Sequence, residues 1–77
     1  MEQMHYAEMA VEYLHQAEVL DKKIISRRRR KKFRTAEERE LNDRAIASLY
    51  EMKRDVLAVQ RLLTKRAAEA EQEESGA

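Results

Sequence analysis

Residues 25–38 read ISRRRRKKFRTAEE, and this stretch decides how the rest of the chain folds. Thr35 is followed three residues later by Glu38, which is the pattern of a capping box at the start of a helix. Glu37 and Glu40 add negative charge near the positive end of the same helix. The sequence therefore predicts a turn at about residues 31–35 and a new helix that begins at about residue 36.

Before this stretch, apolar residues recur at spacings of three and four, as they do on one face of an α-helix. The pattern predicts an amphipathic helix over about residues 3–30, whose larger apolar side chains lie in a core or an interface. Its members are Tyr6, Ala10, Tyr13, Ala17, Leu20 and Ile24.

After the stretch, a second apolar stripe with the same spacings predicts a helix over about residues 36–72, on the order of 50 Å long. We expect residues 73–77 to fray as an acidic tail. The stripe consists of Leu41, Ala45, Leu49, Met52, Val56, Val59, Leu63, Ala67 and Ala70. Beside it lies a further patch of Ile46, Tyr50 and Leu57, which either widens the same face or meets a partner.

These patterns predict an all-α fold, a long antiparallel hairpin of two helices, because short connections favour antiparallel neighbours. One continuous helix is the alternative, since neither Gly nor Pro interrupts the chain before Gly76. A sheet is disfavoured for the same reason, as hairpin turns need such residues. Two helices give a thin core, so we expect a homo-oligomer, in the first place a dimer that forms a four-helix bundle.

The composition limits the function further. The chain has 77 residues, no Cys and no Trp, which allows one domain and excludes disulfides and thiolate zinc sites. No apolar run approaches the roughly 20 residues of a transmembrane segment, and no signal-peptide pattern opens the sequence. We therefore expect a cytoplasmic protein.

Charge is distributed unevenly along the chain. Residues 1–21 carry five acids and no base, residues 22–34 carry nine bases and no acid, and residues 35–77 carry ten acids and seven bases. The basic run suits a polyanion, with nucleic acid as the first choice, and Phe33 offers a ring for stacking on a base. The predicted polyanion-binding residues are Arg27, Arg28, Arg29, Arg30, Lys31, Lys32 and Arg34. The competing interpretation is a solvated helix end that pairs with the acids of the next helix.

Catalytic and metal chemistry find little support. Glu12 and His15 have the i, i+3 spacing of carboxylate–histidine metal sites in helical bundles. They point away from the apolar stripe, however, and a metal site in a bundle faces the core. No serine has a base placed to activate it. The sequence therefore predicts neither a cofactor nor an enzyme.

The first segment also carries a local motif. Tyr13-Leu14 is followed after five residues by Leu20-Asp21 and after two more by Ile24. This motif resembles the opening helix of small proteins encoded by prophages and mobile elements of Gram-positive bacteria, some of them sigma-like regulators. The resemblance implies an accessory protein of such an element. It transfers no functional residue, because those regulators carry a later helix-turn-helix for which this chain has no room.

Together these features predict a small non-enzymatic interaction module that oligomerises through its apolar stripes and contacts a polyanion through a basic tip. The first alternative is a purely structural coiled-coil or bundle protein, or an adaptor for a protein partner, without nucleic-acid binding. A membrane-surface binder is the weaker alternative, because basic and apolar residues are not interleaved along one helix.

Overall fold

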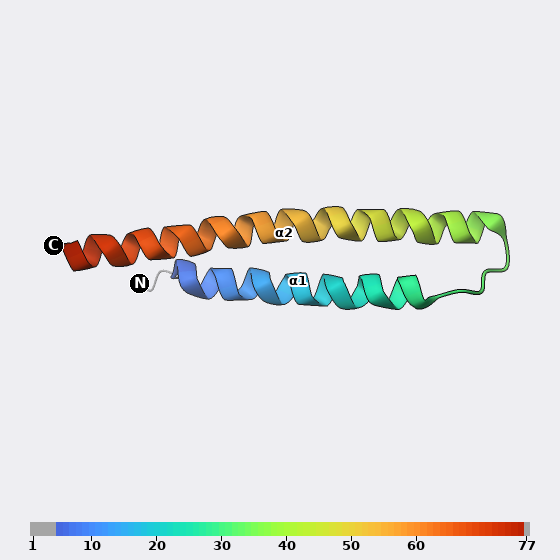
Figure 1. Cartoon of the computed structure of the whole chain (residues 1–77), viewed down its shortest axis with the longest axis horizontal. Helices are drawn as coiled ribbons and strands as arrows, with labels where there is room; N and C mark the ends of the chain where they lie inside the picture. Colours follow the sequence, from blue (N-terminus) through green and yellow to red (C-terminus); the bar gives the residue numbers. More distant parts are fainter. Residues whose placement is uncertain (1–4, 77) are drawn as a thin grey trace.

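The computed structural model describes residues 5–76, and their side chains as far as residue 73. Over this range the chain forms two helices, α1 (Tyr6–Arg29) and α2 (Ala36–Gly76). They lie side by side and antiparallel, with the C-terminal end of α2 extending past the start of α1 (Figure 1). The predicted hairpin is confirmed, and the alternative of one continuous helix is wrong.

The bounds of the helices differ slightly from those predicted. α1 begins at Tyr6, whereas residues 3 and 4 lie outside the described residues. α2 continues to Gly76, four residues past the predicted end at residue 72. The segment before Gly76 is mostly Glu, Gln and Ala, which favour helix, and it contains no residue that breaks one. Ala77 lies outside the described residues.

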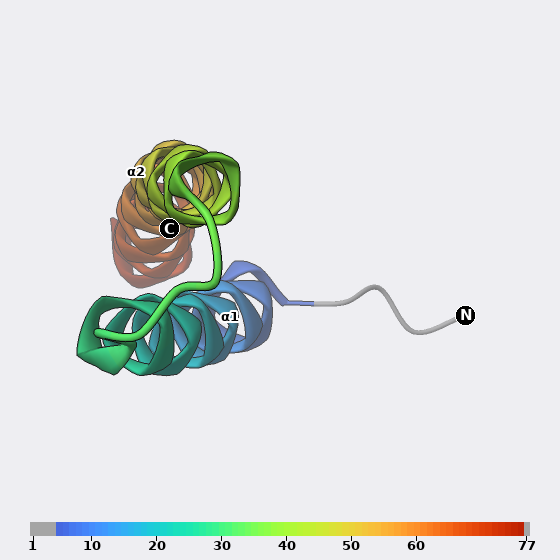
Figure 2. The same cartoon turned by 90° about the vertical axis from the view of Figure 1, so that its right-hand side faces the viewer.

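α1 ends without a glycine. Arg30 has an extended backbone (φ −70°, ψ 119°), and its N–H donates to the carbonyl oxygen of Arg27 at 3.3 Å. Arg27, Arg28 and Arg29 occupy the last turn, where positive charge is favourable beside the unpaired carbonyl groups. Residues 30–35 then cross from α1 to α2, as the view onto the turn shows (Figure 2).

The two helices meet along a seam with the spacing of a heptad repeat. On α1 the buried residues are Ala10, Ala17 and Ile24, each seven positions from the next, with Tyr13 and Leu20 half-buried between them. This side of the seam was predicted from the sequence. On α2 the seam consists of Asn42, Ile46, Leu49, Lys53, Val56, Gln60, Leu63, Ala67 and Ala70, all buried or half-buried.

The stripe predicted for α2 only partly coincides with this seam. Leu49, Val56, Leu63, Ala67 and Ala70 belong to both, but Leu41 is 64% exposed, Met52 is 53% exposed and Val59 is 37% exposed. Their places in the seam are taken by Asn42, Lys53 and Gln60. The reason is that α1 covers one side of a broad apolar face, and Asp21 supplies an ion pair at 2.6 Å that holds Lys53 beside α1.

Other predicted core or interface residues also divide by exposure. Tyr6 and Tyr50 are exposed, so neither belongs to the core of the hairpin. Ile46 and Leu57 are half-buried, Ile46 within the seam and Leu57 beside it. For these two residues the hairpin therefore follows the interpretation that the patch widens one apolar face.

The hairpin buries little apolar surface. Its buried hydrophobic residues are Ala10, Ala17, Ile24 and Leu63, whereas ten large apolar side chains of the described part are exposed. The chain measures 64 × 19 × 18 Å and exposes 6844 Å². A compact monomer of 9.1 kDa exposes about 4,900 Å², which is about 1,900 Å² less. The two open faces of the two-helix layer and the end of α2 that extends past α1 both contribute to this excess.

Candidate polyanion-binding site at the hairpin tip

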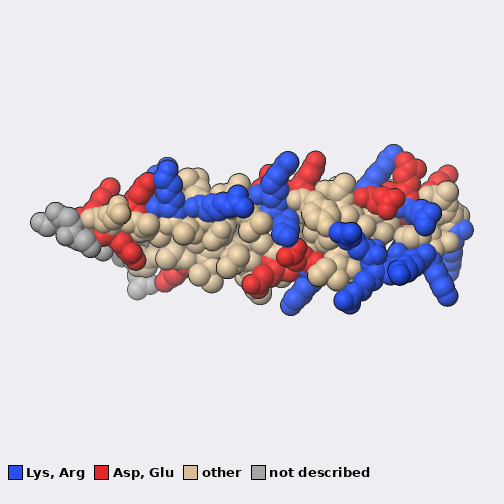
Figure 3. Space-filling model, in the orientation of Figure 1, with Lys and Arg blue, Asp and Glu red and all other residues tan. Residues whose placement is uncertain are grey.

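The basic residues gather at the turn end of the molecule. We call residues 27–34 the basic tip. It comprises the last turn of α1 and most of the connection to α2, and Figure 3 shows Lys and Arg crowded around this end. Lys22 and Lys23 extend the positive surface along α1 and are also exposed. The structure therefore concentrates the charge of the run at one end of a long molecule.

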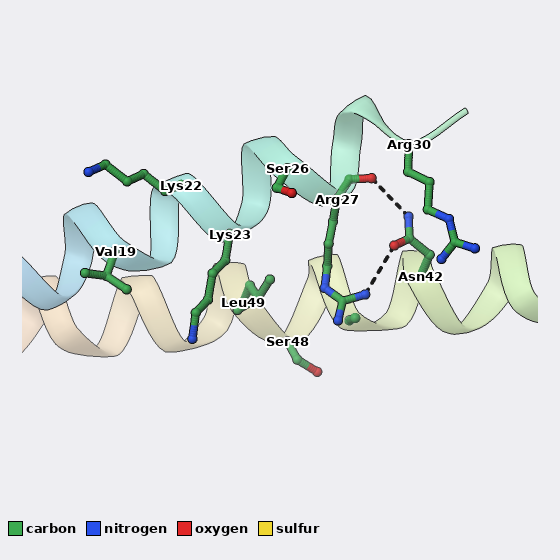
Figure 4. A pocket seen from close by; sticks show the side chains of 10 residues that line it. Val19, Lys22, Lys23, Ser26, Arg27, Arg30, Asn42, Ser48 and Leu49 are labelled. Atoms are coloured by element: carbon green, nitrogen blue, oxygen red, sulfur yellow. Dashed lines mark hydrogen bonds between the residues drawn. The ribbon is translucent and has the colours of Figure 1, made fainter. Parts of the chain in front are cut away.

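Arg27 is tied into the hairpin rather than free for a ligand. Its guanidinium donates to Asn42 Oδ1 at 3.3 Å, and Asn42 Nδ2 donates to the carbonyl oxygen of Arg27 at 3.2 Å (Figure 4). Asn42 is 4% exposed and is the buried polar residue of the described seam. Asn42 was not among the residues predicted from the sequence, although it stands in a heptad series with Leu49, Val56 and Leu63, which is the pattern of a seam residue.

Arg28 and Arg30 also have structural partners. Arg28 Nη1 donates to the hydroxyl of Tyr50 at 2.8 Å, which joins the end of α1 to the middle of α2. Arg30 forms an ion pair with Glu38, and its guanidinium lies 4.8 Å from the centre of the Phe33 ring. Arg39 approaches the same ring at 5.8 Å. The ring proposed for stacking on a base is therefore already engaged with two arginines.

The start of α2 fixes the connection from the other side. The hydroxyl of Thr35 accepts from the backbone N–H of Glu38 at 3.1 Å, as a capping box requires. Glu38 Oε2 accepts from the backbone N–H of Arg34 at 3.0 Å, one residue before the expected partner Thr35. The hydrogen bond from Arg34 and the one from Arg30 lower the pKa of Glu38 below 4.5.

Four members of the basic tip remain available for a ligand. Arg29, Lys31, Lys32 and Arg34 are exposed, and their side chains make no hydrogen bond or ion pair with residues 5–73. The predicted seven-residue site thus separates into three arginines that hold the hairpin together and four cations that point into solvent. Sequence composition alone does not separate these two groups.

The acids at the start of α2 neutralise little of this charge. Glu38 pairs with Arg30, while Glu40 pairs with Arg44 of its own helix at 2.9 Å. Neither Glu37 nor Asp43 forms an ion pair with a described side chain. The interpretation in which the basic run pairs with these acids therefore applies to Arg30 and not to the remaining cations.

A basic groove continues from the tip along one face of the hairpin. It has a volume of about 830 Å³, and Lys22, Lys23 and Arg27 from α1 and Arg30 just after it line the groove together with Ala45, Ser48 and Leu49 from α2. In Figure 4 the side chains of Lys23 and Arg27 cross toward α2. The groove therefore combines an apolar floor with positive charge from one helix.

No family model, curated protein or solved structure matches this chain. The likeness of Tyr13–Ile24 to helices of mobile-element proteins therefore stays a prediction. Any function has to be argued from the residues of this chain.

The remaining sequence candidates lie away from the tip. His15 Nδ1 lies 4.0 Å from Glu18, on an exposed part of α1, and Glu12 is exposed as well. Within residues 5–76, no group of three His, Cys, Asp or Glu side chains is close enough to hold a metal ion. No helix in this range is both long and apolar enough to span a membrane.

Proposed function

We propose that the protein is a small helical interaction module that binds a polyanion, with nucleic acid as the first choice, through its basic tip. The observation that supports this most directly is the exposure of Arg29, Lys31, Lys32 and Arg34 without a partner among the described side chains. Like charges held close together repel one another, and phosphates relieve this repulsion while releasing their counterions.

The rigidity of the tip also favours this function. Arg27, Arg28 and Arg30 anchor the end of α1 to α2, so the solvent-facing cations are carried on a fixed connection. A preorganised array loses less conformational entropy on binding than the same residues in a disordered tail. Arg29 and Arg34 additionally offer forked guanidinium groups that match phosphate geometry.

We also propose that two hairpins pair to form a four-helix bundle. The exposed surface of 6844 Å² exceeds that of a compact monomer of this mass by about 1,900 Å². A standard protein interface buries about 1,200–2,000 Å² in total, which this excess supplies. The exposed large apolar residues, from Val11 at 66% to Val59 at 37%, provide the apolar part of such an interface.

The polyanion proposal is tested by fluorescence anisotropy, with labelled duplex DNA and labelled single-stranded RNA titrated across a salt series. We expect binding whose logarithm falls steeply with the logarithm of salt, by about 0.9 per phosphate contacted on duplex DNA. The triple variant R29Q/K31Q/K32Q is expected to lower this slope by about 1 per lost contact and to weaken binding to all sequences alike.

A matched control distinguishes a site from general attraction. The triple variant R54Q/R61Q/K65Q removes the same charge from exposed positions on α2, away from the tip. Equal loss of binding in both triple variants would mean that the tip is not a site. Absence of binding by the unsubstituted protein at about 50 mM salt, where phosphate contacts are strong, would reject the proposal and favour a purely structural or protein-binding module.

A further inference from the structure

One face of α2 carries a second heptad row that α1 leaves uncovered. Its positions follow one another at spacings of four and three, and Ala45 and Ser48 of this row line the basic groove. The apolar members Leu41, Met52, Val59 and Leu62 are all exposed, between 37% and 64%. In sequence order the row is Glu37, Leu41, Ala45, Ser48, Met52, Asp55, Val59, Leu62, Arg66 and Glu69.

This row is complementary to itself when it is read in the opposite direction. With the two-fold axis placed between residues 51 and 52, Met52 lies within one residue of its own copy, Leu41 lies opposite Leu62, and Ser48 lies opposite Asp55, to whose carboxylate its hydroxyl can donate. Farther from the axis, residues of opposite charge lie opposite one another. Glu37 lies opposite Arg66 within this row, and Arg34, in the connection just before α2 and outside the row, lies at about the height of Glu69. Such self-complementarity is what a two-fold symmetric interface requires.

The same face of α1 has this property independently. Val19, Lys23, Ser26 and Arg30 line the same groove, and they form a heptad row that continues back to Gln16, Glu12 and Met9. Reversed about a point beside residue 21, this row brings Glu12 opposite Arg30 and Gln16 opposite Ser26.

The two rows have their centres at the same height along the hairpin. The α2 row is symmetric about a point between residues 51 and 52 and the α1 row about residue 21, and the ion pair between Asp21 and Lys53 places these two points close together along the hairpin. One axis perpendicular to the helices therefore satisfies both rows at once. The self-complementarity of one row does not require the centre of the other row to lie at the same height.

The overall charge of the hairpin is complementary in the same direction. The turn half, residues 22–48, carries eleven bases and four acids, whereas residues 5–21 and 49–73 together carry nine acids and five bases. Antiparallel stacking of two copies places each basic half against an acidic half, while parallel stacking places like charges together. Salt screens charges in contact less than charges farther apart. At moderate salt, the electrostatic preference for antiparallel stacking therefore mainly affects the stability of the docked dimer.

We propose that a second copy of this chain docks on the groove face, with α2 antiparallel to α2 of the second copy and Met52 at the two-fold axis. This proposal names the interface of the bundle proposed above and rests on it. Val59 of the second copy then lies in the groove beside Ala45, and Leu62 of the second copy lies beside Leu41. The acidic end of each copy lies beside the basic tip of the other.

Cysteine cross-linking tests the register, because the natural chain contains no cysteine. Under mild oxidation, M52C is expected to form a disulfide-linked dimer, since its two copies meet at the axis. L41C and L62C alone are expected to stay unlinked, whereas their mixture forms a linked heterodimer. Y50C is the matched control, because Tyr50 lies at nearly the same height but on the side of α2 that contacts Arg28.

Sedimentation separates failure of this interface from failure of the bundle. The unsubstituted protein is expected to sediment at twice the mass of the 9.1 kDa chain, and M52E at the mass of one chain. A dimer that is linked through Y50C and not through M52C overturns the proposed face while the bundle stands. A monomer at all concentrations overturns both the proposed face and the bundle. The polyanion proposal does not depend on this result, because the anisotropy titration tests it separately.

Discussion

Arg27 and Asn42 are joined twice, once through their side chains at 3.3 Å and once from the Asn42 amide to the Arg27 carbonyl oxygen at 3.2 Å. A buried asparagine at a seam position of a coiled coil fixes the register, because a shifted pairing leaves its amide unsatisfied. Here the amide oxygen of Asn42 also accepts a hydrogen bond from the guanidinium of Arg27, which belongs to the basic tip. The site and the fold are therefore coupled at this pair.

The first prediction concerns this pair. N42A is expected to lower the free energy of unfolding by about 1–2 kcal/mol, because it removes two hydrogen bonds at a buried position. Urea denaturation followed by circular dichroism measures the change. Q72A, which replaces an exposed amide near the end of α2, is the control and is expected to have little effect. Equal stability of N42A and the unsubstituted protein would show that the pair does not hold the register.

The second prediction compares two neighbouring isoleucines. Ile24 is 3% exposed and Ile25 is 49% exposed. The two residues are of the same type and adjacent in α1, so they differ mainly in burial. I24A is expected to lower the free energy of unfolding by about 2–4 kcal/mol, and I25A is expected to change it by no more than about 0.5 kcal/mol. Thermal and urea unfolding of both variants provide the measurement. A large effect of I25A would indicate that a partner covers the face opposite the groove.

How far the sequence predicts this structure depends on the helix. On α1 the apolar spacing identified the buried residues Ala10, Ala17 and Ile24. On α2 it also selected Met52 and Val59, which are exposed. Apolar residues cover two adjacent faces of α2, and the apolar spacing alone gives one direction that lies between these two faces. Only the contact with α1 separates these faces.

The basic tip was likewise predicted only in part from the sequence. The sequence located the basic run, and charge alone was sufficient for that. It did not separate Arg27, Arg28 and Arg30 from the solvent-facing cations, because their partners Asn42, Tyr50 and Glu38 lie on the other helix. Contacts between distant parts of the chain require the hairpin register, which local spacing does not contain.

The third prediction concerns acid and the start of α2. Because the folded state lowers the pKa of Glu38, its contribution to stability is fully present above the ordinary value of 4.5 and is lost as the pH falls through the lower folded value. E38Q is expected to reduce the loss of stability between pH 6 and the acid range, as urea denaturation at several pH values would show. T35A, which removes the cap, is expected to cost about 1 kcal/mol at every pH. An identical pH dependence in E38Q and the unsubstituted protein would contradict the assignment.

The last prediction links the acidic end to the basic tip and rests on the proposed antiparallel dimer. In that dimer Glu69 lies beside Arg34 of the second copy, so E69Q removes two equivalent ion pairs. The cost is about 1 kcal/mol in total at low salt, or about a fivefold rise in the Kd of the dimer. The same substitution is expected to strengthen polyanion binding, because Glu69 no longer competes with phosphate for the tip. E71Q changes the charge equally but lies on another face of α2, so it is expected to leave the Kd of the dimer unchanged. Sedimentation and anisotropy titration of the two variants at the same salt concentrations provide the comparison, and equal behaviour of E69Q and E71Q would leave only a general charge effect.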